Sequence, residues 1–412
     1  MKNKIVLVTS AQPTANPRLV KEAKSLLQAG YVVSVIWCPI SPWADDFDKK
    51  LFDELPTIKW LKAGYHAKSE PIGYWYARIR QKYWKYFYKI FGNHSDAPIK
   101  SQVLYSQELR GLSAQQKADI YIGHNLGSLP AIVTAANKYN AKSIFDFEDF
   151  HRGETSEDTL ETKMVKEIEG RYILLVDNIT TASFAITIEY QKIFPKKKIT
   201  TINNCFSLSY SVDFVQKLSS RPLKIFWFSQ YIGKQRGLQT VIKAMSKFSP
   251  DEIQLTLLGK ASNELKQYFY ELMIEVGLDK SQVEFLDPVH ESEIVKIASK
   301  HHIGLASEYV HIVNRDLCLT NKLFMYMLAG NALLMSDTKS QEYFFKQNSN
   351  IGLLYKQEDV DSIANVLKFY LDNPTYLEDN REKSLQLAKS RYNWEIEQHI
   401  FLDNLKSTLD PL

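Results

Sequence analysis

The stretch Asn314-Arg-Asp-Leu-Cys-Leu-Thr-Asn-Lys-Leu-Phe-Met-Tyr-Met-Leu-Ala-Gly330 is the part of the 412-residue sequence that says most about its fold. Polar residues give way after Asn321-Lys322 to an apolar helical run that ends at Ala329-Gly330. Lys322 falls in the first turn of this expected helix, where a cation is mildly unfavourable unless an anion also binds there. The placement favours an anionic ligand, and a lysine that only reaches solvent is the equal alternative.

Outward from this stretch, short apolar runs alternate with helix-period segments, which is typical of strand–helix units in a parallel sheet. The expected strands are Ile5–Val8, Val32–Trp37, Asp119–Gly123 and Ser143–Asp146 in a first series, and Leu223–Phe228, Ile253–Leu258, Val283–Leu286, Ile303–Ala306 and Ala332–Met335 in a second. The two series join near residues 204–220, and residues 361–412 are almost wholly helical in pattern. We therefore predict an α/β protein of two doubly wound Rossmann-like domains. In open parallel sheets, ligands bind beyond the carboxyl ends of the strands, so we expect the site in a cleft between the two sheets.

Composition and charge exclude several classes of protein. With 45% hydrophobic and 24% charged residues, the chain is expected to be soluble and globular. A net charge of +4 argues against binding of nucleic acid mainly through phosphate contacts. Cys38, Cys205 and Cys318 show no paired spacing, so neither a disulfide framework nor a zinc site is indicated, and a reducing cytoplasm is expected. We expect no signal peptide and no membrane-spanning helix.

Common catalytic motifs are missing. The first strand-to-helix loop, residues 10–17, has no glycine, which argues against a dinucleotide-binding fingerprint. The phosphate-binding P-loop, the His-Glu-x-x-His zinc motif and the Gly-x-Ser-x-Gly elbow are also absent. Residues 146–151 hold three carboxylates and a histidine but lack the spacing of a calcium loop, so no metal is expected.

Two further loops are candidates for ligand binding. Arg236 and Gly237 precede an expected helix, so that a cation and free backbone N–H groups are presented together, as suits a phosphate or diphosphate. The alternative is a solvated basic loop. His124 and Asn125 follow the strand Asp119–Gly123, and a histidine there could hydrogen-bond a sugar hydroxyl or act as an acid or base. A histidine satisfied by neighbouring backbone is the equal alternative.

In their order along the chain, these motifs resemble the family 4-like glycosyltransferases of the GT-B fold. The segments that carry the resemblance are Asn16–Gly30, His124–Leu126, Phe145–Glu148, Ser229–Gly237, Pro288–Glu293 and Asn321–Gly330. The resemblance implies an acceptor-side domain over residues 1–205, a nucleotide-sugar-binding domain over 206–385, and a C-terminal helix over 386–412 that packs back on the first domain.

The resemblance also implies roles for individual residues. The expected catalytic residues are His124, Glu148, Arg236 and Lys322. The expected donor-binding residues are Gln230, Gly237, Lys260, Val289, Glu308, Asp316, Thr320 and Asn321, and the acceptor-side residues are Asn16, Arg18, Asn125 and Asp146. The implied activity is transfer of a hexose from a nucleotide-diphosphate sugar to a glycan or lipid-linked acceptor in cell-surface polysaccharide synthesis. It would be retaining, with no metal and no cofactor, because two cations can stabilise the departing diphosphate.

The sequence departs from the family at several positions. The family usually has glutamates at the positions of Leu317 and Met325, an arginine in place of Gln230 and an aspartate in place of Asn125. Ribose would then be held by Asp316, Thr320 or Glu308, or donor binding would be weak or lost. Two alternatives to a transferase therefore remain, a non-catalytic binding or scaffold protein of the same fold and a sugar-nucleotide epimerase.

One segment stands outside the family pattern. Residues 74–91 interleave nine aromatic with five basic residues, a composition typical of a helix lying in an anionic membrane interface. Such a helix would make the protein peripheral on the inner face of the cell membrane. The equal alternative is a helix that packs on the first domain and extends its lysines into solvent.

Overall fold

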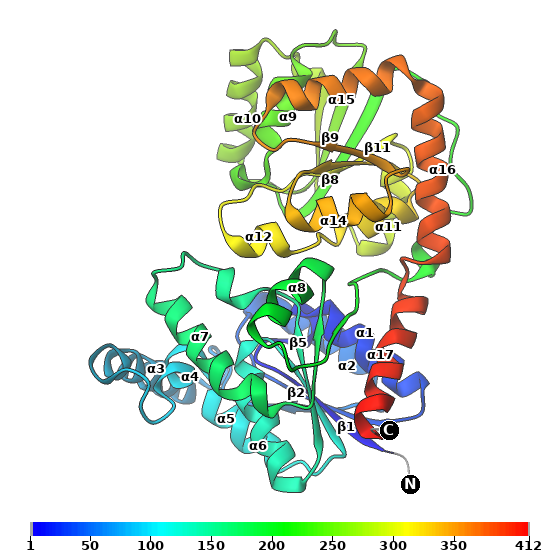
Figure 1. Ribbon diagram of the computed structural model, residues 1–412. Coiled ribbons are helices and arrows are strands. Elements are labelled where there is room, and N and C mark those ends of the chain that lie inside the picture. The colour runs from blue at the N-terminus through cyan, green and yellow to red at the C-terminus, as the bar shows by residue number, and fades with distance from the viewer. Residues whose placement is uncertain (1–2, 411–412) are drawn as a thin grey trace. The chain divides into compact units, whose positions relative to one another are not determined.

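The computed structural model describes residues 3–410, which form two compact units (Figure 1). The first unit contains the chain up to Ile202, Ile312–Asn314 and the chain from Gln398 onward. The second contains Asn203–His311 and Arg315–Glu397. The division after Ile202 lies three residues before the expected boundary at 205.

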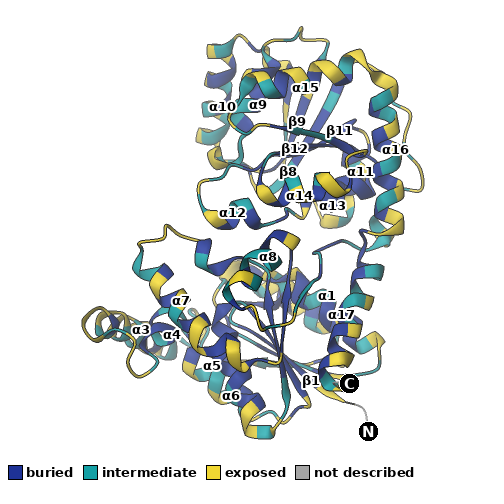
Figure 2. Cartoon of the chain, viewed as in Figure 1, coloured by how far each residue is buried: buried dark blue, intermediate teal, exposed yellow. Residues whose placement is uncertain are grey.

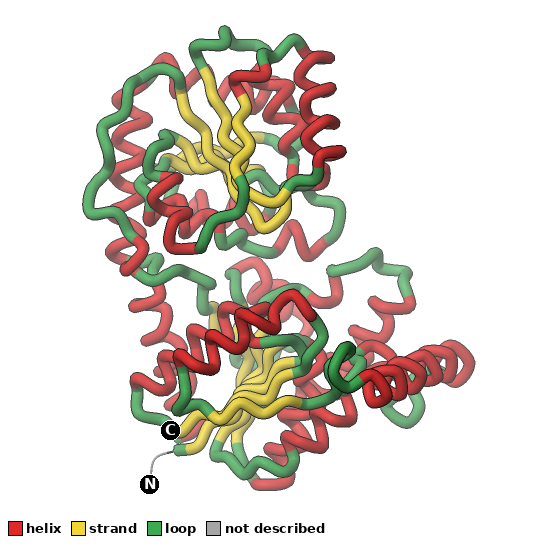
Figure 3. Tube along the Cα trace, turned by 180° about the vertical axis from the view of Figure 1, so that it is seen from behind, coloured by secondary structure: helices red, strands yellow, loops and turns green. Residues whose placement is uncertain are grey.

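The first unit is built on a seven-stranded parallel sheet with the order β3-β2-β1-β4-β5-β6-β7. Its strands are β1 (Lys4–Thr9), β2 (Val32–Trp37), β3 (Lys59–Lys62), β4 (Ile120–His124), β5 (Lys142–Phe147), β6 (Asn178–Thr181) and β7 (Ile199–Thr201). Strands β1 and β2 are near-continuous apolar runs, as expected where helices cover both faces of a sheet (Figure 3). Figure 1 shows α1 and α17 on one side of it and α5, α6 and α7 on the other.

The register of this sheet brings four polar residues into one row. Thr9 on β1 is paired with His124 on β4, His124 with Asp146 on β5, and Asp146 with Thr180 on β6. All four side chains are buried and lie at the carboxyl ends of their strands. Because in-register neighbours of a parallel sheet project to the same face, their polar atoms must satisfy one another or a ligand.

The helices of the first unit follow the strands in turn. They are α1 (Pro17–Gln28), α2 (Asp45–Glu54), α3 (Pro71–Phe91), α4 (Ala97–Gln102), α5 (Ser106–Ser113), α6 (Leu129–Tyr139), α7 (Leu160–Tyr172) and α8 (Phe184–Ile193). Helix α1 begins with a side-chain cap: the Asn16 side chain accepts from the backbone N–H of Leu19, and Pro17 occupies the first helical position.

The second unit has a six-stranded parallel sheet with the order β10-β9-β8-β11-β12-β13. Its strands are β8 (Leu223–Tyr231), β9 (Ile253–Lys260), β10 (Val283–Leu286), β11 (Ile303–Ala306), β12 (Ala332–Ser336) and β13 (Gly352–Tyr355). Its helices are α9 (Leu238–Met245), α10 (Asn263–Val276), α11 (Glu291–Ala298), α13 (Lys322–Leu328), α14 (Lys339–Gln347), α15 (Val360–Asp372) and α16 (Pro374–Ser390). Helix α12 (Val313–Leu317) begins in the first unit and enters the second at Arg315. Every residue of α13 is buried, so this helix is part of the core rather than a surface element.

The last helix, α17 (Trp394–Leu409), returns the chain to the first unit. Ser25 of α1 donates to Gln398 at 3.0 Å, and Asn404 accepts from Asn178 at 2.8 Å and from Thr200 at 3.0 Å. The two parallel α/β sheets and the returning helix confirm the predicted fold class. The return begins at Gln398, because α16 and the start of α17 belong to the second unit. Within residues 3–410, no helix combines the length and the apolar character needed to cross a bilayer.

Candidate functional site

The first unit holds a buried ion cluster where β4 and β5 end. Arg18, on α1, donates from Nε and Nη2 to the two carboxylate oxygens of Asp146, each at 2.8 Å, and from Nη1 to the Ile202 carbonyl at 2.6 Å. Thr180 also donates to Asp146, at 2.5 Å. The guanidinium is fully buried and all three of its nitrogens donate, so its role is to join α1, β5 and the residue that follows β7.

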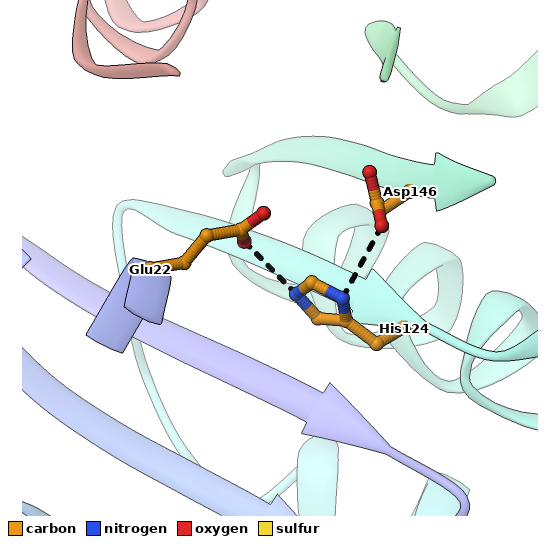
Figure 4. A group of neighbouring side chains, drawn as sticks. All are labelled: Glu22, His124 and Asp146. Atoms are coloured by element: carbon orange, nitrogen blue, oxygen red, sulfur yellow. Dashed lines mark ion pairs between the residues drawn. The ribbon is translucent and has the colours of Figure 1, made fainter. Parts of the chain in front are cut away.

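His124 lies between two carboxylates of this cluster (Figure 4). Its Nε2 is 3.0 Å from Glu22 Oε2 and its Nδ1 is 3.5 Å from Asp146 Oδ2. Burial opposes a charge on the imidazole, but the attraction of Glu22 and Asp146 outweighs it and raises the pKa of His124 to about 10. His124, Arg18 and the two carboxylates therefore form a charge-balanced set in which His124 is an imidazolium.

The same side chains have the composition of a metal site, because ligand atoms of Glu22, His124 and Asp146 lie within 4.8 Å of one another. A metal ion needs the free electron pair of a neutral imidazole, and it would have to displace the second proton of His124, whose pKa is raised to about 10 by the two carboxylates. Both oxygens of Asp146 already accept from the guanidinium of Arg18, whose positive charge would repel a metal ion. Glu22, His124 and Asp146 are therefore better suited to hold a proton on His124 and the guanidinium of Arg18 than to hold a metal ion.

Glu148 follows β5 and is partly exposed, next to this cluster. Burial raises its pKa to about 7, helped by the nearby carboxylates of Asp146 and Asp149 and opposed by Arg18 and His124. A carboxyl group that titrates near neutral pH can donate or accept a proton, which is the property required of an acid or base in catalysis. Of the acidic residues predicted for the first unit's site, Glu148 has the more suitable chemistry, since Asp146 is held ionised by Arg18.

The other acceptor-side residues have structural partners. Asn16 is buried and caps α1. Asn125 has a φ of +63° and accepts from the Thr9 hydroxyl at 2.7 Å, so that it fixes the turn after β4. His124 is itself 1% exposed. Among the residues assigned to the first unit's site, Glu148 and Asn125 have exposed surface, and Asn16, Arg18, His124 and Asp146 form the support beneath them.

In the second unit, three cations surround the buried carboxylate of Glu308, just after β11. Lys322 Nζ is 2.9 Å from Oε1, and the Nη1 atoms of Arg236 and Arg315 are 3.5 and 3.7 Å from Oε2. Burial alone would favour the neutral acid, but the three positive charges lower the pKa of Glu308. One carboxylate leaves this set with a formal charge of +2, which is the electrostatic complement of a diphosphate.

The loop that carries Arg236 is fixed by Gly237. This glycine has a φ of +72°, and a Cβ atom there would lie 2.5 Å from the hydroxyl of Ser307. That hydroxyl donates to the Arg236 carbonyl at 2.5 Å. Gly237 thus allows the loop after β8 to approach the end of β11, and α9 begins at the next residue.

A cavity of about 430 Å³ adjoins this loop within the second unit. Its lining comes from the ends of β8, β11 and β13 and from the beginnings of α9 and α15, and includes Lys234, Gly237, Thr240, Glu308, Tyr355 and Gln357. A cavity beyond the carboxyl ends of parallel strands, next to a helix N-terminus, is the usual place for a nucleotide in a doubly wound sheet.

The remaining predicted donor-side residues are not all in this group. Asp316 accepts from the backbone N–H of Lys339 at 2.8 Å and so supports the start of α14. Asn321 is exposed and Thr320 half-buried, directly before Lys322. Gln230, Lys260 and Val289 are exposed on the strand ends and loops of β8, β9 and β10. Of the predicted residues of the second unit, the structure brings together Arg236, Gly237, Glu308 and Lys322. The other predicted donor-binding residues lie outside this group.

Leu317 and Met325, which replace the family's carboxylates, are both buried. Met325 packs in a hydrophobic cluster with Phe226, Leu333 and Phe344. Neither position can contribute a ribose contact from an apolar side chain in the core.

Sequence reasoning missed two charged residues. Glu22 lies four residues after Arg18 on α1, and its Oε1 is 3.5 Å from the Arg18 guanidinium. Arg315 lies within the stretch Asn314–Gly330 and completes the cation set. The i,i+4 spacing of Arg18 and Glu22 on an expected helix could have indicated their contact. No pattern in the sequence indicated the contact of Arg315, because its partner Glu308 comes from the loop after β11.

Comparison with known proteins gives the same fold. Residues 235–399 match the family described as glycosyl transferase-like. No protein of curated function matches the sequence. Over residues 235–399 the chain is similar to the glycosyl transferase-like family, and its fold is the GT-B fold.

Solved glycosyltransferase structures match nearly the whole chain at low sequence identity. Anabaena HepE in complex with UDP is 12% identical, with 99% of this chain and 100% of that chain covered and a TM-score of 0.67. Sucrose-phosphate synthase from Thermosynechococcus elongatus is 14% identical, with 98% and 99% covered and a TM-score of 0.71. A glycosyltransferase from Rickettsia africae is 12% identical, with both chains fully covered and a TM-score of 0.68. At these identities the likeness shows a shared fold.

Proposed function

We propose that this GT-B protein transfers a hexose from a nucleotide-diphosphate donor held by its second unit. The observation that carries the proposal is the set of Arg236, Arg315 and Lys322 around Glu308, beside a cavity of about 430 Å³. When the bond between the sugar's anomeric carbon and the diphosphate breaks, negative charge collects on the leaving group. Fixed cations next to that position stabilise the charge without a metal ion. HepE, which shares the fold, was crystallised with UDP and with UDP-glucose, which supports a uridine nucleotide as the first donor to test.

The acceptor would be a glycan or a lipid-linked precursor of a cell-surface polysaccharide, used on the cytoplasmic side of the membrane, and the anomeric configuration would be retained. The support for this part comes from the family resemblance. Glu148, whose pKa is raised to about 7, is the residue of the first unit that we assign to proton transfer with the acceptor hydroxyl.

Thermal unfolding with nucleotide sugars tests the donor assignment. We expect UDP, UDP-glucose or another nucleotide diphosphate to raise the melting temperature, because a ligand that binds only the folded state stabilises it. Arg236→Ala and Arg315→Ala should each reduce that increase by at least half, since both cations are partly exposed and free to reach an anion. Lys368→Ala, which removes an exposed cation on α15, is the matched control and should leave the increase unchanged. Absence of a shift with every nucleotide diphosphate would contradict the proposal.

A second candidate is a non-catalytic member of the same fold. It is favoured by the burial of Leu317 and Met325 where the family has carboxylates. Donor turnover separates the two functions. A transferase releases nucleotide diphosphate from its donor, slowly even without acceptor, and loses that release in Arg236→Ala. A binding protein is stabilised by the nucleotide sugar but leaves it intact after prolonged incubation.

A further inference from the structure

Helix α3 exposes a continuous stripe of large apolar side chains. Eight of the twenty-two exposed large hydrophobic residues in the described chain lie on this one helix. Seven of them, Ile72, Trp75, Tyr76, Ile79, Tyr83, Tyr86 and Ile90, are spaced three or four residues apart, apart from the adjacent pair Trp75 and Tyr76. Ile72 is 88% exposed, Ile79 68% and Trp75 61%. A spacing of three and four residues places these side chains on one face of the helix.

The opposite face of α3 is firmly packed, so the exposure of the stripe does not come from a detached helix. Tyr88 is buried with Ala97 of α4 and Met164 of α7, and Trp84 and Phe87 pack against the same cluster. Gln81 donates to the Ser101 carbonyl at 3.0 Å. Figures 1 and 2 show α3 at the outer edge of the first unit beside α4, with exposed residues along it.

A row of cations runs beside the apolar stripe. Arg78, Lys82, Lys85 and Lys89 are exposed and follow one another at intervals of three or four residues, about a quarter turn from the centre of the stripe. Helix α3 contains no acidic residue, and its nearest ion pairs run to other elements, Arg80 to Glu108 and Lys85 to Glu161. The face presented to solvent is therefore apolar at its centre and positive along one side.

We propose that this face of α3 docks on an anionic lipid bilayer, with the helix lying in the plane of the interface. Tryptophan and tyrosine are enriched at the boundary between lipid headgroups and acyl chains, and adjacent basic side chains are attracted to anionic headgroups. At 21 residues, the helix presents a surface about 30 Å long. Each of its exposed cations adds to the attraction only if the partner is negative, which favours anionic over zwitterionic lipid.

A second copy of this chain is a less suitable partner for the same face. A two-fold symmetric contact would place α3 against α3 and bring the two rows of Arg78, Lys82, Lys85 and Lys89 together. Because α3 supplies no acidic residue to neutralise them, the contact would combine apolar burial with repulsion between like charges. A bilayer takes up the apolar stripe and neutralises the cations at once.

Co-sedimentation of the full chain with lipid vesicles tests the proposal. The vesicles are phosphatidylcholine alone or phosphatidylcholine with about a third phosphatidylglycerol, at low and at high salt. We expect binding to the anionic vesicles and weaker binding to phosphatidylcholine. At 1 M salt, where the Debye length falls to about 3 Å, binding to the anionic vesicles should drop to the level seen with phosphatidylcholine. The variant Trp75→Ser/Ile79→Ser/Tyr83→Ser should weaken binding about tenfold or more because it removes the centre of the stripe. Arg78→Gln/Lys82→Gln/Lys89→Gln should weaken it about tenfold or more on anionic vesicles only.

The controls separate docking by α3 from general adsorption. Ile274→Ser/Phe369→Ser removes two exposed apolar side chains of the second unit and should bind as the unaltered protein does. All substituted side chains are exposed, so the melting temperature should stay unchanged in each variant. Brominated lipid should quench the fluorescence of the unaltered protein more than that of Trp75→Phe. The proposal is overturned by absent vesicle binding, by binding that survives the stripe substitutions, or by a dimer that forms through α3 while vesicles remain unbound. The readout is lipid binding alone, so the result does not depend on donor turnover.

Discussion

Lys322 Nζ lies 2.9 Å from Glu308 Oε1, and both side chains are buried. Burial lowers the pKa of Lys322, while the attraction of Glu308 opposes that effect. Glu308 thus serves as an internal counterion that holds Lys322, Arg236 and Arg315 together when no ligand is bound. This arrangement keeps three cations together at the end of β11 while the buried Lys322 remains paired with a carboxylate.

The variant Glu308→Gln tests this counterion role. It removes the negative charge and leaves Lys322 buried without compensation, so we expect the free energy of unfolding to fall by about 3 kcal/mol. A nucleotide diphosphate should then raise the melting temperature of the variant more than that of the unaltered protein, because the ligand supplies the missing anion. Glu342→Gln, which alters an exposed ion pair on α14, is the matched control and should change stability by less than about 1 kcal/mol. Equal stabilisation of both proteins by the ligand would show that Glu308 and the diphosphate do not compete for the cations.

Replacing Arg18 with lysine should be strongly destabilising. The guanidinium makes two parallel bonds to Asp146 and a third to the Ile202 carbonyl, and a single ammonium group cannot reproduce that geometry. Breaking a buried pair costs about 3–5 kcal/mol, so we expect Arg18→Lys to lose about 3 kcal/mol in urea denaturation. The same exchange at Arg171, whose exposed guanidinium pairs with the half-buried Asp96, should cost less than about 1 kcal/mol. Similar losses at the two positions would contradict a special role for the bidentate pair.

The raised pKa of His124 predicts a pH dependence of stability. An imidazole in the unfolded chain titrates near about 6.5, whereas the pKa of His124 in the folded chain is about 10. The folded state therefore binds the extra proton more tightly, so this stabilisation is fully present below pH 6.5 and is lost as the pH rises through about 10. The difference in the free energy of unfolding between the unaltered protein and His124→Asn should be largest near pH 6 and shrink steadily toward pH 10. A difference that stays constant over this range would mean that His124 is neutral in the folded chain.

Sequence patterns predicted the fold because most of the expected strands are rich in apolar residues and alternate with helices in both units. Strands β3, β6 and β7 lack a long apolar run and were not predicted, and neither was the short strand β13. They placed Arg236 and Gly237 before α9 and His124 at the end of β4, since loops after strands are where polar residues interrupt apolar ones. The burial of His124 could not be predicted in this way. It depends on the register that sets Asp146 beside it and on Glu22 reaching across from α1.

The contacts of Glu308 in the second unit could not be predicted for the same reason. Glu308 was predicted as a ribose contact, but in the folded chain it accepts from Lys322 and pairs with Arg236 and Arg315. Its three partners come from separate loops and helices, and spacing along the chain does not specify which of them meet. The apolar residues of α3 show a related ambiguity, because the sequence does not tell which aromatic side chains of a helix are packed in the core and which are exposed. Only the packing of Tyr88 and Trp84 on α4 and α7 shows which face is left exposed.

The buried position of Met325 predicts that restoring the family's carboxylate will not restore a ribose contact. Met325 is 0% exposed and packs among Phe226, Leu333 and Phe344. An ionised glutamate there would be transferred from water into an apolar core, so we expect Met325→Glu to lower the free energy of unfolding by roughly 3 kcal/mol or more. Met325→Leu keeps the volume and should cost less than about 1.5 kcal/mol. If Met325→Glu were as stable as Met325→Leu and bound UDP more tightly, the side chain at this position would reach the nucleotide, and the loss of the carboxylate would be a loss of donor affinity rather than a feature of the core.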